Sequence, residues 1–190
     1  MSAAVLRLVP IFCAEQVSLL RPLQARLQRV FGFTVEEHPP GFDPELAFDA
    51  GRGQYNSRVL LAQLLRSAHD DGARILGVAG VDLFIPVLTF VFGEAQLDGR
   101  AAVVSSHRLH NELYGLPADR DLLFARLVKE AVHELGHTYG LVHCRNGGCV
   151  MQVSNYVEEV DIKSDRFCDP CLRLLREARA RPLSKAAAGR

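Results

Sequence analysis

Two features are absent from this sequence: a net charge and a long uninterrupted apolar segment. The 22 Lys and Arg residues balance 22 Asp and Glu residues, so neither a nucleic acid nor an anionic membrane surface is expected as a partner. The longest apolar stretch, residues 75–92, contains Asp82 and Pro86 and does not predict a membrane span. The shorter apolar segment Val5–Cys13 contains Arg7 and predicts a buried strand rather than a secretory signal. These absences favour a cytoplasmic protein.

The length and composition indicate one globular domain. A chain of 190 residues with 48% hydrophobic and 23% charged residues is long enough to bury a core and has the composition of an ordinary enzyme. We expect residues 1–180 to form a single domain with two lobes around a cleft. Residues 181–190 lack apolar anchors and are expected to form a disordered tail. A monomer is the expected state.

Apolar residues recur with the periods of strands and helices in alternating order. Short β-rich runs predict strands at Val5–Phe12, Phe33–Glu37, Arg74–Val81, Thr89–Phe92 and Ala101–Ser105. Helical spacing predicts helices at Val17–Phe31, Tyr55–His69, Arg120–Tyr139 and Cys171–Ala180. This order predicts the α/β (α+β) class, with a mixed, mostly parallel sheet and a loop-rich C-terminal part.

Some boundaries follow from single residues. Asp119 is expected to cap the helix at Arg120–Tyr139, because its side chain can accept a hydrogen bond from a free N–H of the first turn. Pro22 is compatible with a helix only in the first turn, so the first helix is expected to begin a few residues after Val17. Residues 38–53, interrupted by several prolines and glycines, are expected to form a surface loop.

Residues 133–143 read His-Glu-Leu-Gly-His-Thr-Tyr-Gly-Leu-Val-His. His133 and His137 are four residues apart, so on a helix both imidazoles lie on one face and can reach one metal ion. Gly140 permits a left-handed turn that returns the chain and brings His143 within reach as a third ligand. Three protein ligands leave a fourth position open, as in a catalytic zinc site. Glu134, beside the first ligand, is placed to take a proton from a metal-bound water.

Two other interpretations of this motif are weaker. A helix whose histidines face solvent or the core would leave Gly140 and His143 unexplained. A site that binds zinc without performing chemistry is excluded neither by the spacing nor by the residue types. The retention of Glu134 nevertheless favours a catalytic centre.

Four cysteines follow the motif in two pairs. Cys144 and Cys149 are separated by four residues, and Cys168 and Cys171 by two, a spacing that lets two thiolates bind one ion from a tight turn. Four sulfur ligands would form a closed, structural zinc site. Two disulfides are the alternative, but no secretory signal is visible and Cys13 would be left over, so zinc is favoured. Cys13 itself is expected to be a buried, inert thiol.

The complete pattern resembles the metzincin zinc peptidases, and the cysteine pairs around Met151 resemble the archaemetzincin branch. This resemblance implies a metzincin-like twisted sheet with an active-site helix. It also implies that His133, His137 and His143 bind the catalytic zinc, that Glu134 is the general base, and that Met151 is the methionine of a Met-turn below the metal. The four cysteines, Cys144, Cys149, Cys168 and Cys171, would hold a second, structural zinc, which gives two Zn²⁺ per chain.

The expected function is zinc-dependent hydrolysis of peptide bonds in a peptide or protein substrate. Zinc lowers the pKa of its bound water to about 7, and Glu134 would act first as base and then as acid. Metzincins pair an extended substrate with an exposed strand edge, for which Gly93–Ala102 is the candidate, although an ordinary hairpin tip would have the same sequence pattern. The alternative function is a zinc-stabilised protein that binds peptides without cleaving them.

Overall fold

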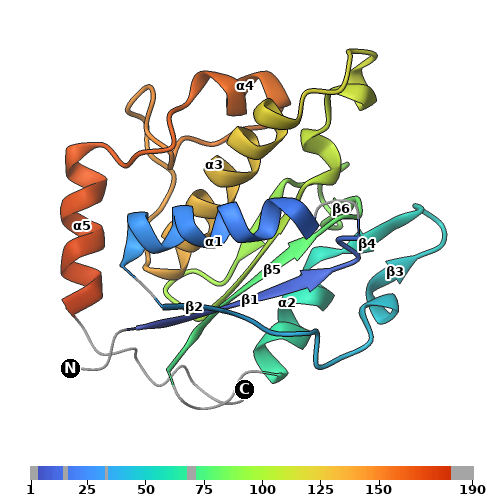
Figure 1. The fold of residues 1–190 in the computed structure, drawn as a ribbon, viewed down its shortest axis with the longest axis horizontal. Coiled ribbons are helices and arrows are strands. Elements are labelled where there is room, and N and C mark those ends of the chain that lie inside the picture. Colours follow the sequence, from blue (N-terminus) through green and yellow to red (C-terminus); the bar gives the residue numbers. More distant parts are fainter. Residues whose placement is uncertain (1–3, 15–16, 33, 68–71, 181–190) are drawn as a thin grey trace.

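The computed structural model describes residues 4–14, 17–32, 34–67 and 72–180. A five-stranded sheet forms its centre, with helices packed against both faces (Figure 1). The strands follow the order β2-β1-β5-β8-β7 and are parallel except for β7, which runs antiparallel to β8. Their bounds are Val5–Ile11 (β1), Thr34–Glu37 (β2), Arg74–Ala79 (β5), Gly93–Ala95 (β7) and Ala101–Ser105 (β8). The predicted fold class, with a mixed and mostly parallel sheet, is confirmed.

The helices connect and cover these strands. The α-helices within the described ranges are Val17–Phe31 (α1), Ser57–Arg66 (α2), Arg120–Thr138 (α3), Val157–Ile162 (α4) and Asp169–Ala180 (α5), with short 3-10 helices at Pro44–Ala47, His107–Leu109 and Asn111–Tyr114. Helix α3 begins after the predicted cap, because the Asp119 side chain accepts a hydrogen bond of 2.9 Å from the backbone N–H of Leu122. Helix α4 was not predicted and lies in the expected loop-rich C-terminal part.

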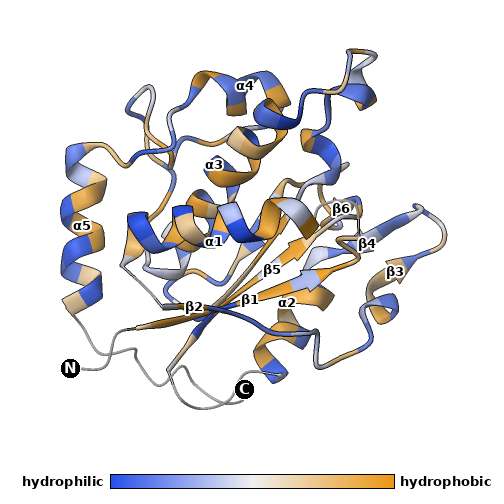
Figure 2. Ribbon diagram, in the orientation of Figure 1, coloured by the Kyte–Doolittle hydropathy of each residue, from blue (hydrophilic) through white to orange (hydrophobic). Residues whose placement is uncertain are grey.

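Alternate residues of the central strands contribute to two hydrophobic cores. Leu8 packs into the core beneath α1 and α3, whereas the next residue, Val9, packs into the core beneath α2. In β8, Val104 packs into the core beneath α1 and α3, and Val103 packs into the core beneath α2. Figure 2 shows that β5 is hydrophobic, whereas α5 mixes hydrophilic and hydrophobic residues. Helix α3 thereby packs across β8 and β7, which places its C-terminal half beside the edge of the sheet.

The predicted strand at Thr89–Phe92 is wrong. Within it only Val91 forms a bridge, to Leu83, and the strand that pairs with β8 is β7, which lies inside the candidate edge Gly93–Ala102. The alternation of apolar residues resembles a strand, but the carbonyl oxygen of Thr89 accepts hydrogen bonds from the Arg52 and Gln54 side chains instead of a ladder partner. Side-chain donors from a distant segment therefore override the local pattern.

The expectation of a simple loop over residues 38–53 is also wrong. This segment contains a 3-10 helix and a strand, Phe48–Asp49 (β3), which joins Gln54–Asn56 (β4) and Leu83–Phe84 (β6) in a second sheet of order β3-β4-β6. Because β4 occupies the start of the predicted helix Tyr55–His69, α2 begins at Ser57, with the Asn56 side chain accepting from the Arg58 N–H at 3.1 Å.

Pro22 lies within α1, which is already helical at Val17, so the expectation of a later start is wrong. The proline is exposed and removes the hydrogen bond to the carbonyl of Ser18, an exposed residue near the helix start. The predicted end of the second helix at His69 and the predicted tail at residues 181–190 fall outside the described residues. Among the helices described, none has the length and apolar character needed to cross a membrane.

Candidate metal centres

Three histidines converge at the C-terminal end of α3. His133 and His137 lie one turn apart on this helix, and His143 follows it. One ring nitrogen from each of the three lies within 4.8 Å of the others, and the Nε2 atoms of His133 and His137 are 3.0 Å apart. The structure therefore brings together the three predicted histidines in a group able to hold one metal ion.

The turn after α3 brings His143 to this position. Gly140 has a φ of +80°, the left-handed conformation in which a residue with a Cβ would be strained. Its N–H donates to the carbonyl of His137 at 2.8 Å, and the Leu141 N–H donates to the carbonyl of Gly136 at 3.3 Å. These two bonds satisfy carbonyl groups at the helix end and reverse the chain, as the sequence predicted.

The histidine rings are held with one nitrogen free for a metal. Nδ1 of His133 lies 2.8 Å from the carbonyl oxygen of Val150, and Nδ1 of His137 lies 2.6 Å from that of Leu141. Because a carbonyl oxygen only accepts, both Nδ1 atoms carry the proton, which leaves the Nε2 lone pairs available. Burial lowers the pKa of His133, His137 and His143, and the positive charge of Lys163 adds to this effect. Neutral imidazoles are the form that binds zinc, so the residues fit the ion.

Glu134 lies buried beside the first histidine. Burial raises its pKa well above the ordinary value, the charge of Glu130 raises it further, and Lys163 acts in the opposite direction. Gly93 of β7 packs directly on this carboxylate: a Cβ at Gly93 would lie 2.6 Å from Glu134 Cγ and 2.7 Å from the Val103 carbonyl oxygen. A glycine at this point of the edge strand therefore makes room for Glu134.

Met151 is fully buried against α3. A Cβ at Gly136 would lie 2.5 Å from its sulfur atom, so Gly136 permits the close approach of the methionine to the helix between His133 and His137. The Met151 carbonyl accepts a hydrogen bond of 2.9 Å from the Cys144 N–H. These contacts place Met151 against the histidine-bearing helix, and its role as the methionine of a Met-turn below the metal stays a prediction.

A buried ion pair that sequence reasoning missed lies beside this site. Lys163 Nζ is 2.8 Å from a carboxylate oxygen of Glu130, and the two side chains are 0% and 4% exposed. Lys163 also donates to the Gln152 carbonyl at 3.2 Å, next to Met151. Glu130 precedes Glu134 by one helical turn, a spacing visible in the sequence. Lys163 follows an unpredicted helix, and no local pattern indicates its partner.

The four predicted cysteines form a second cluster. One sulfur from each of Cys144, Cys149, Cys168 and Cys171 lies within 4.8 Å of the others, and all four are free thiols. Backbone N–H groups point at two of them: Asn146 N lies 3.4 Å from Cys144 Sγ, and Cys168 N lies 3.4 Å from Cys149 Sγ. Such donors stabilise thiolates, so the geometry suits a metal ion and contains none of the disulfides of the alternative interpretation.

Cys13 lies apart from this cluster. It is buried, as predicted, and its thiol donates to the Val78 carbonyl at 2.7 Å. Burial raises the pKa of this thiol to about 11, which leaves it protonated at neutral pH.

A cleft of about 560 Å³ opens beside the three histidines. One part of its wall is formed by residues from Ile85 to Gly93, and another part by residues from Val153 to Tyr156. Glu130, His133, Glu134 and His143 also line the cleft. A smaller pocket continues along β7, past Gly93, Glu94 and Ala95. The buried carboxylate and the histidines therefore face a space large enough for a peptide.

This chain resembles known proteins over most of its length. The family model described as "Peptidase family M54" matches residues 43–177. An archaemetzincin of Methanocaldococcus jannaschii is 43% identical over 160 residues, which cover 84% of this chain and 86% of that protein.

Two solved structures have the same fold. The crystal structure of archaemetzincin from Methanopyrus kandleri superposes with a TM-score of 0.83 at 38% identity, over 94% of this chain and 97% of that one. A zinc-dependent peptidase from Methanocorpusculum labreanum superposes with a TM-score of 0.80 at 34% identity, over 90% of this chain and 99% of that one. This chain therefore belongs to peptidase family M54, the archaemetzincins, and is a zinc metallopeptidase.

Proposed function

We propose that this chain hydrolyses peptide bonds at a zinc ion held by His133, His137 and His143, with Glu134 as general base. The observation that carries this proposal is the convergence of three neutral imidazole nitrogens beside a buried carboxylate at a peptide-sized cleft. When bound, zinc supplies a Lewis acid that polarises a carbonyl and lowers the pKa of a coordinated water.

Glu134 carries the proton in this scheme. Its carboxylate takes a proton from the attacking water and later delivers it to the leaving amine. Burial favours the protonated carboxyl group, whereas an adjacent divalent cation favours the carboxylate, so the two effects oppose each other. Gly93 leaves the carboxylate room beside the edge strand, and the apolar side chain of Met151 packs beneath the histidines.

The edge strand β7 offers a place for the substrate backbone. It ends the sheet order, so its outer edge has no partner strand within the described residues. Residues Gly93–Ala95 line a pocket together with His133 and Glu134. An extended peptide that pairs with this edge places one of its carbonyl groups near the histidines without any demand on its sequence. The proposed edge is thus shorter than the predicted Gly93–Ala102.

The cysteine cluster supports a second, structural zinc. Four thiolates complete a tetrahedral site and leave no position for substrate. Because Cys144 directly follows His143 and Cys171 lies in the first turn of α5, this ion would fix the third histidine to the C-terminal helix. We infer two zinc ions per chain, and one domain whose lobes meet at the cleft.

A mixed peptide library tests the proposal. The zinc-loaded protein is incubated with the library, and cleavage is read by mass spectrometry before and after removal of metal by a chelator. We expect cuts that disappear on chelation and return when zinc is added. Absence of cleavage by protein with two bound zinc ions would support the alternative, a zinc-stabilised peptide-binding protein.

A further inference from the structure

The segment Ile85–Phe92 forms one wall of the cleft without regular secondary structure. It lies between β6 and β7, with one bridge from Val91 to Leu83 and one hydrogen bond of 2.8 Å from the Ser105 N–H to the Phe92 carbonyl. Leu88, which is 52% exposed, lines the cleft, and so do Val153 and Tyr156, which are 45% and 66% exposed. Several exposed apolar side chains in one cleft indicate a site for an apolar ligand group.

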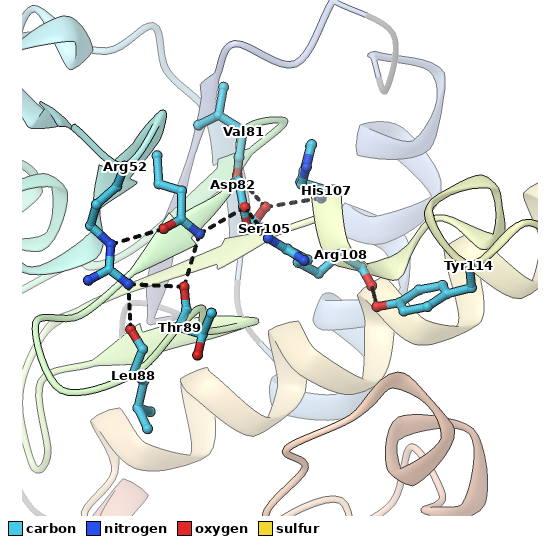
Figure 3. A network of polar contacts seen from close by, with 10 residues as sticks. Arg52, Val81, Asp82, Leu88, Thr89, Ser105, His107, Arg108 and Tyr114 are labelled. Carbon is cyan, nitrogen blue, oxygen red and sulfur yellow. Dashed lines mark hydrogen bonds and ion pairs between the residues drawn. The ribbon is translucent and has the colours of Figure 1, made fainter. Parts of the chain in front are cut away.

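Side chains from the turn between β3 and β4 and from β4 hold this wall in place. The Arg52 guanidinium donates to the carbonyls of Leu88 at 2.9 Å and Thr89 at 3.3 Å (Figure 3). Gln54 donates to the same Thr89 carbonyl at 3.0 Å, and its oxygen accepts from Arg52 Nε at 3.1 Å. Three hydrogen bonds from Arg52 and Gln54 thus occupy carbonyl groups that a strand would satisfy through its ladder.

Asp82 ties these donors to the rest of the protein. It accepts from Gln54 at 2.9 Å and from Arg108 at 2.9 and 2.6 Å (Figure 3). Burial raises the pKa of Asp82, but the hydrogen bonds from Arg108 and Gln54 outweigh it and hold the pKa below its ordinary value. The Arg108 guanidinium also lies 4.8 Å from the ring centre of Phe90 in the same wall.

One of the two carboxylates that line the cleft is already paired. Glu130 lines the cleft, but its carboxylate contacts the buried Lys163 ammonium at 2.8 Å. A basic side chain of a ligand would find Glu130 occupied, and Glu134 is the base of the proposed reaction. An acidic side chain would face both carboxylates. The exposed apolar residues and the pairing of Glu130 therefore favour an apolar group.

We propose that Arg52 and Gln54 are positioning residues that hold Ile85–Phe92 as the wall of a subsite for a large apolar side chain of the peptide. This inference rests on the proposed function, because the occupant is part of the substrate. Neither residue touches the reacting atoms. Both hold the carbonyls of Leu88 and Thr89, so the wall is already ordered before a peptide binds. Less conformational entropy is therefore lost on binding.

Kinetics on matched peptides test the subsite. The peptides differ at one position, which carries Phe, Leu, Asp or Lys, and the zinc-loaded variants are Arg52→Met, Arg52→Lys and Gln54→Leu. We expect wild type to prefer Phe and Leu. Arg52→Met should raise KM for the Phe peptide about 10-fold with kcat within about 2-fold, and Arg52→Lys should recover part of the loss. Arg66→Met, on the exposed end of α2, is the control.

Hydrogen exchange provides a readout that needs no turnover. The Leu88 and Val91 amides donate to the carbonyls of Ile85 and Leu83 and are expected to be protected in wild type. Faster exchange at these amides in Arg52→Met, with the amides of α3 unchanged, would support the positioning role. Unchanged exchange and KM, a loss confined to kcat, or a wild-type preference for Asp or Lys would each overturn the inference.

Equilibrium binding distinguishes a failure of the proposed hydrolysis from a failure of the proposed subsite. If the wild type cleaves none of the peptides, calorimetry on the zinc-loaded protein measures their affinities instead. Tighter binding of the Phe peptide than of the Asp peptide, weakened in Arg52→Met, would support the subsite although the proposed hydrolysis fails. Equal affinities would overturn the subsite as well.

Discussion

Gly93 of the edge strand and Glu134 of α3 are in contact so close that no side chain fits between them. A Cβ at Gly93 would lie 2.6 Å from Glu134 Cγ and 2.7 Å from the Val103 carbonyl oxygen. The second of these atoms belongs to the backbone of the neighbouring strand and cannot rotate away. The carboxylate therefore lies directly against the edge strand, which would bring the backbone of a peptide paired with this strand close to the proposed base.

Gly93→Ala is expected to reduce turnover about 100-fold with zinc retained, because the added methyl group displaces Glu134 or the strand edge. The measurement is kcat/KM together with metal content. Gly147→Ala is the matched control, since a Cβ there meets no atom within 4 Å. Full activity of Gly93→Ala would show that the contact does not constrain the carboxylate.

Lys163→Met is expected to lower the free energy of unfolding by about 3–5 kcal/mol, because it leaves the buried Glu130 carboxylate without its cation. Urea unfolding of the zinc-loaded protein measures the change. The double variant Glu130→Gln, Lys163→Met should recover much of the loss, since neither buried charge remains. A double variant as unstable as the single one would contradict this explanation.

Cys168→Ser is expected to reduce the zinc content from two ions per chain to one and to lower the melting temperature, because a structural ion contributes its binding energy to folding. Metal analysis and calorimetry provide the two measurements. Cys13→Ser, which keeps a donor near the Val78 carbonyl, should retain both ions. Two ions in the Cys168→Ser protein would argue against the four-cysteine site.

Glu134→Gln is expected to stabilise the zinc-free protein at pH 8. Burial raises the folded-state pKa of Glu134, so the folded protein binds this proton more tightly than the unfolded chain. The resulting destabilisation is present in full above the folded pKa and disappears below the unfolded value of about 4.3. The advantage of the variant should therefore shrink as pH falls, as measured by denaturant unfolding with chelator present. An advantage that grows at low pH would contradict the assignment.

The histidines and cysteines could be predicted from the sequence because their geometry is mostly local. His133, His137 and His143 lie on one helix and the turn after it, so their spacing alone determines that they converge. The same holds for the short spacings within each cysteine pair. The strands β1, β5 and β8 were also predictable, since their buried residues form compact apolar runs.

The parts that could not be predicted depend on contacts between distant segments. The apolar residues of Thr89–Phe92 follow a strand pattern, but Arg52 and Gln54 bind the Thr89 carbonyl from another sheet. Lys163 reaches Glu130 across 33 positions of sequence. The need for glycine at position 93 arises only when α3 packs against β7. In each case the decisive partner is not a neighbour in the sequence.

The most direct test of the central claim compares wild type with Glu134→Ala in one assay. Both proteins are loaded with zinc, their metal content is measured, and peptide cleavage is followed by mass spectrometry. We expect equal zinc content in the two proteins, cleavage by the wild type, and a loss of cleavage in the variant, because the ligands remain and the proton carrier is gone. Cleavage by Glu134→Ala at the wild-type rate would contradict the proposed mechanism.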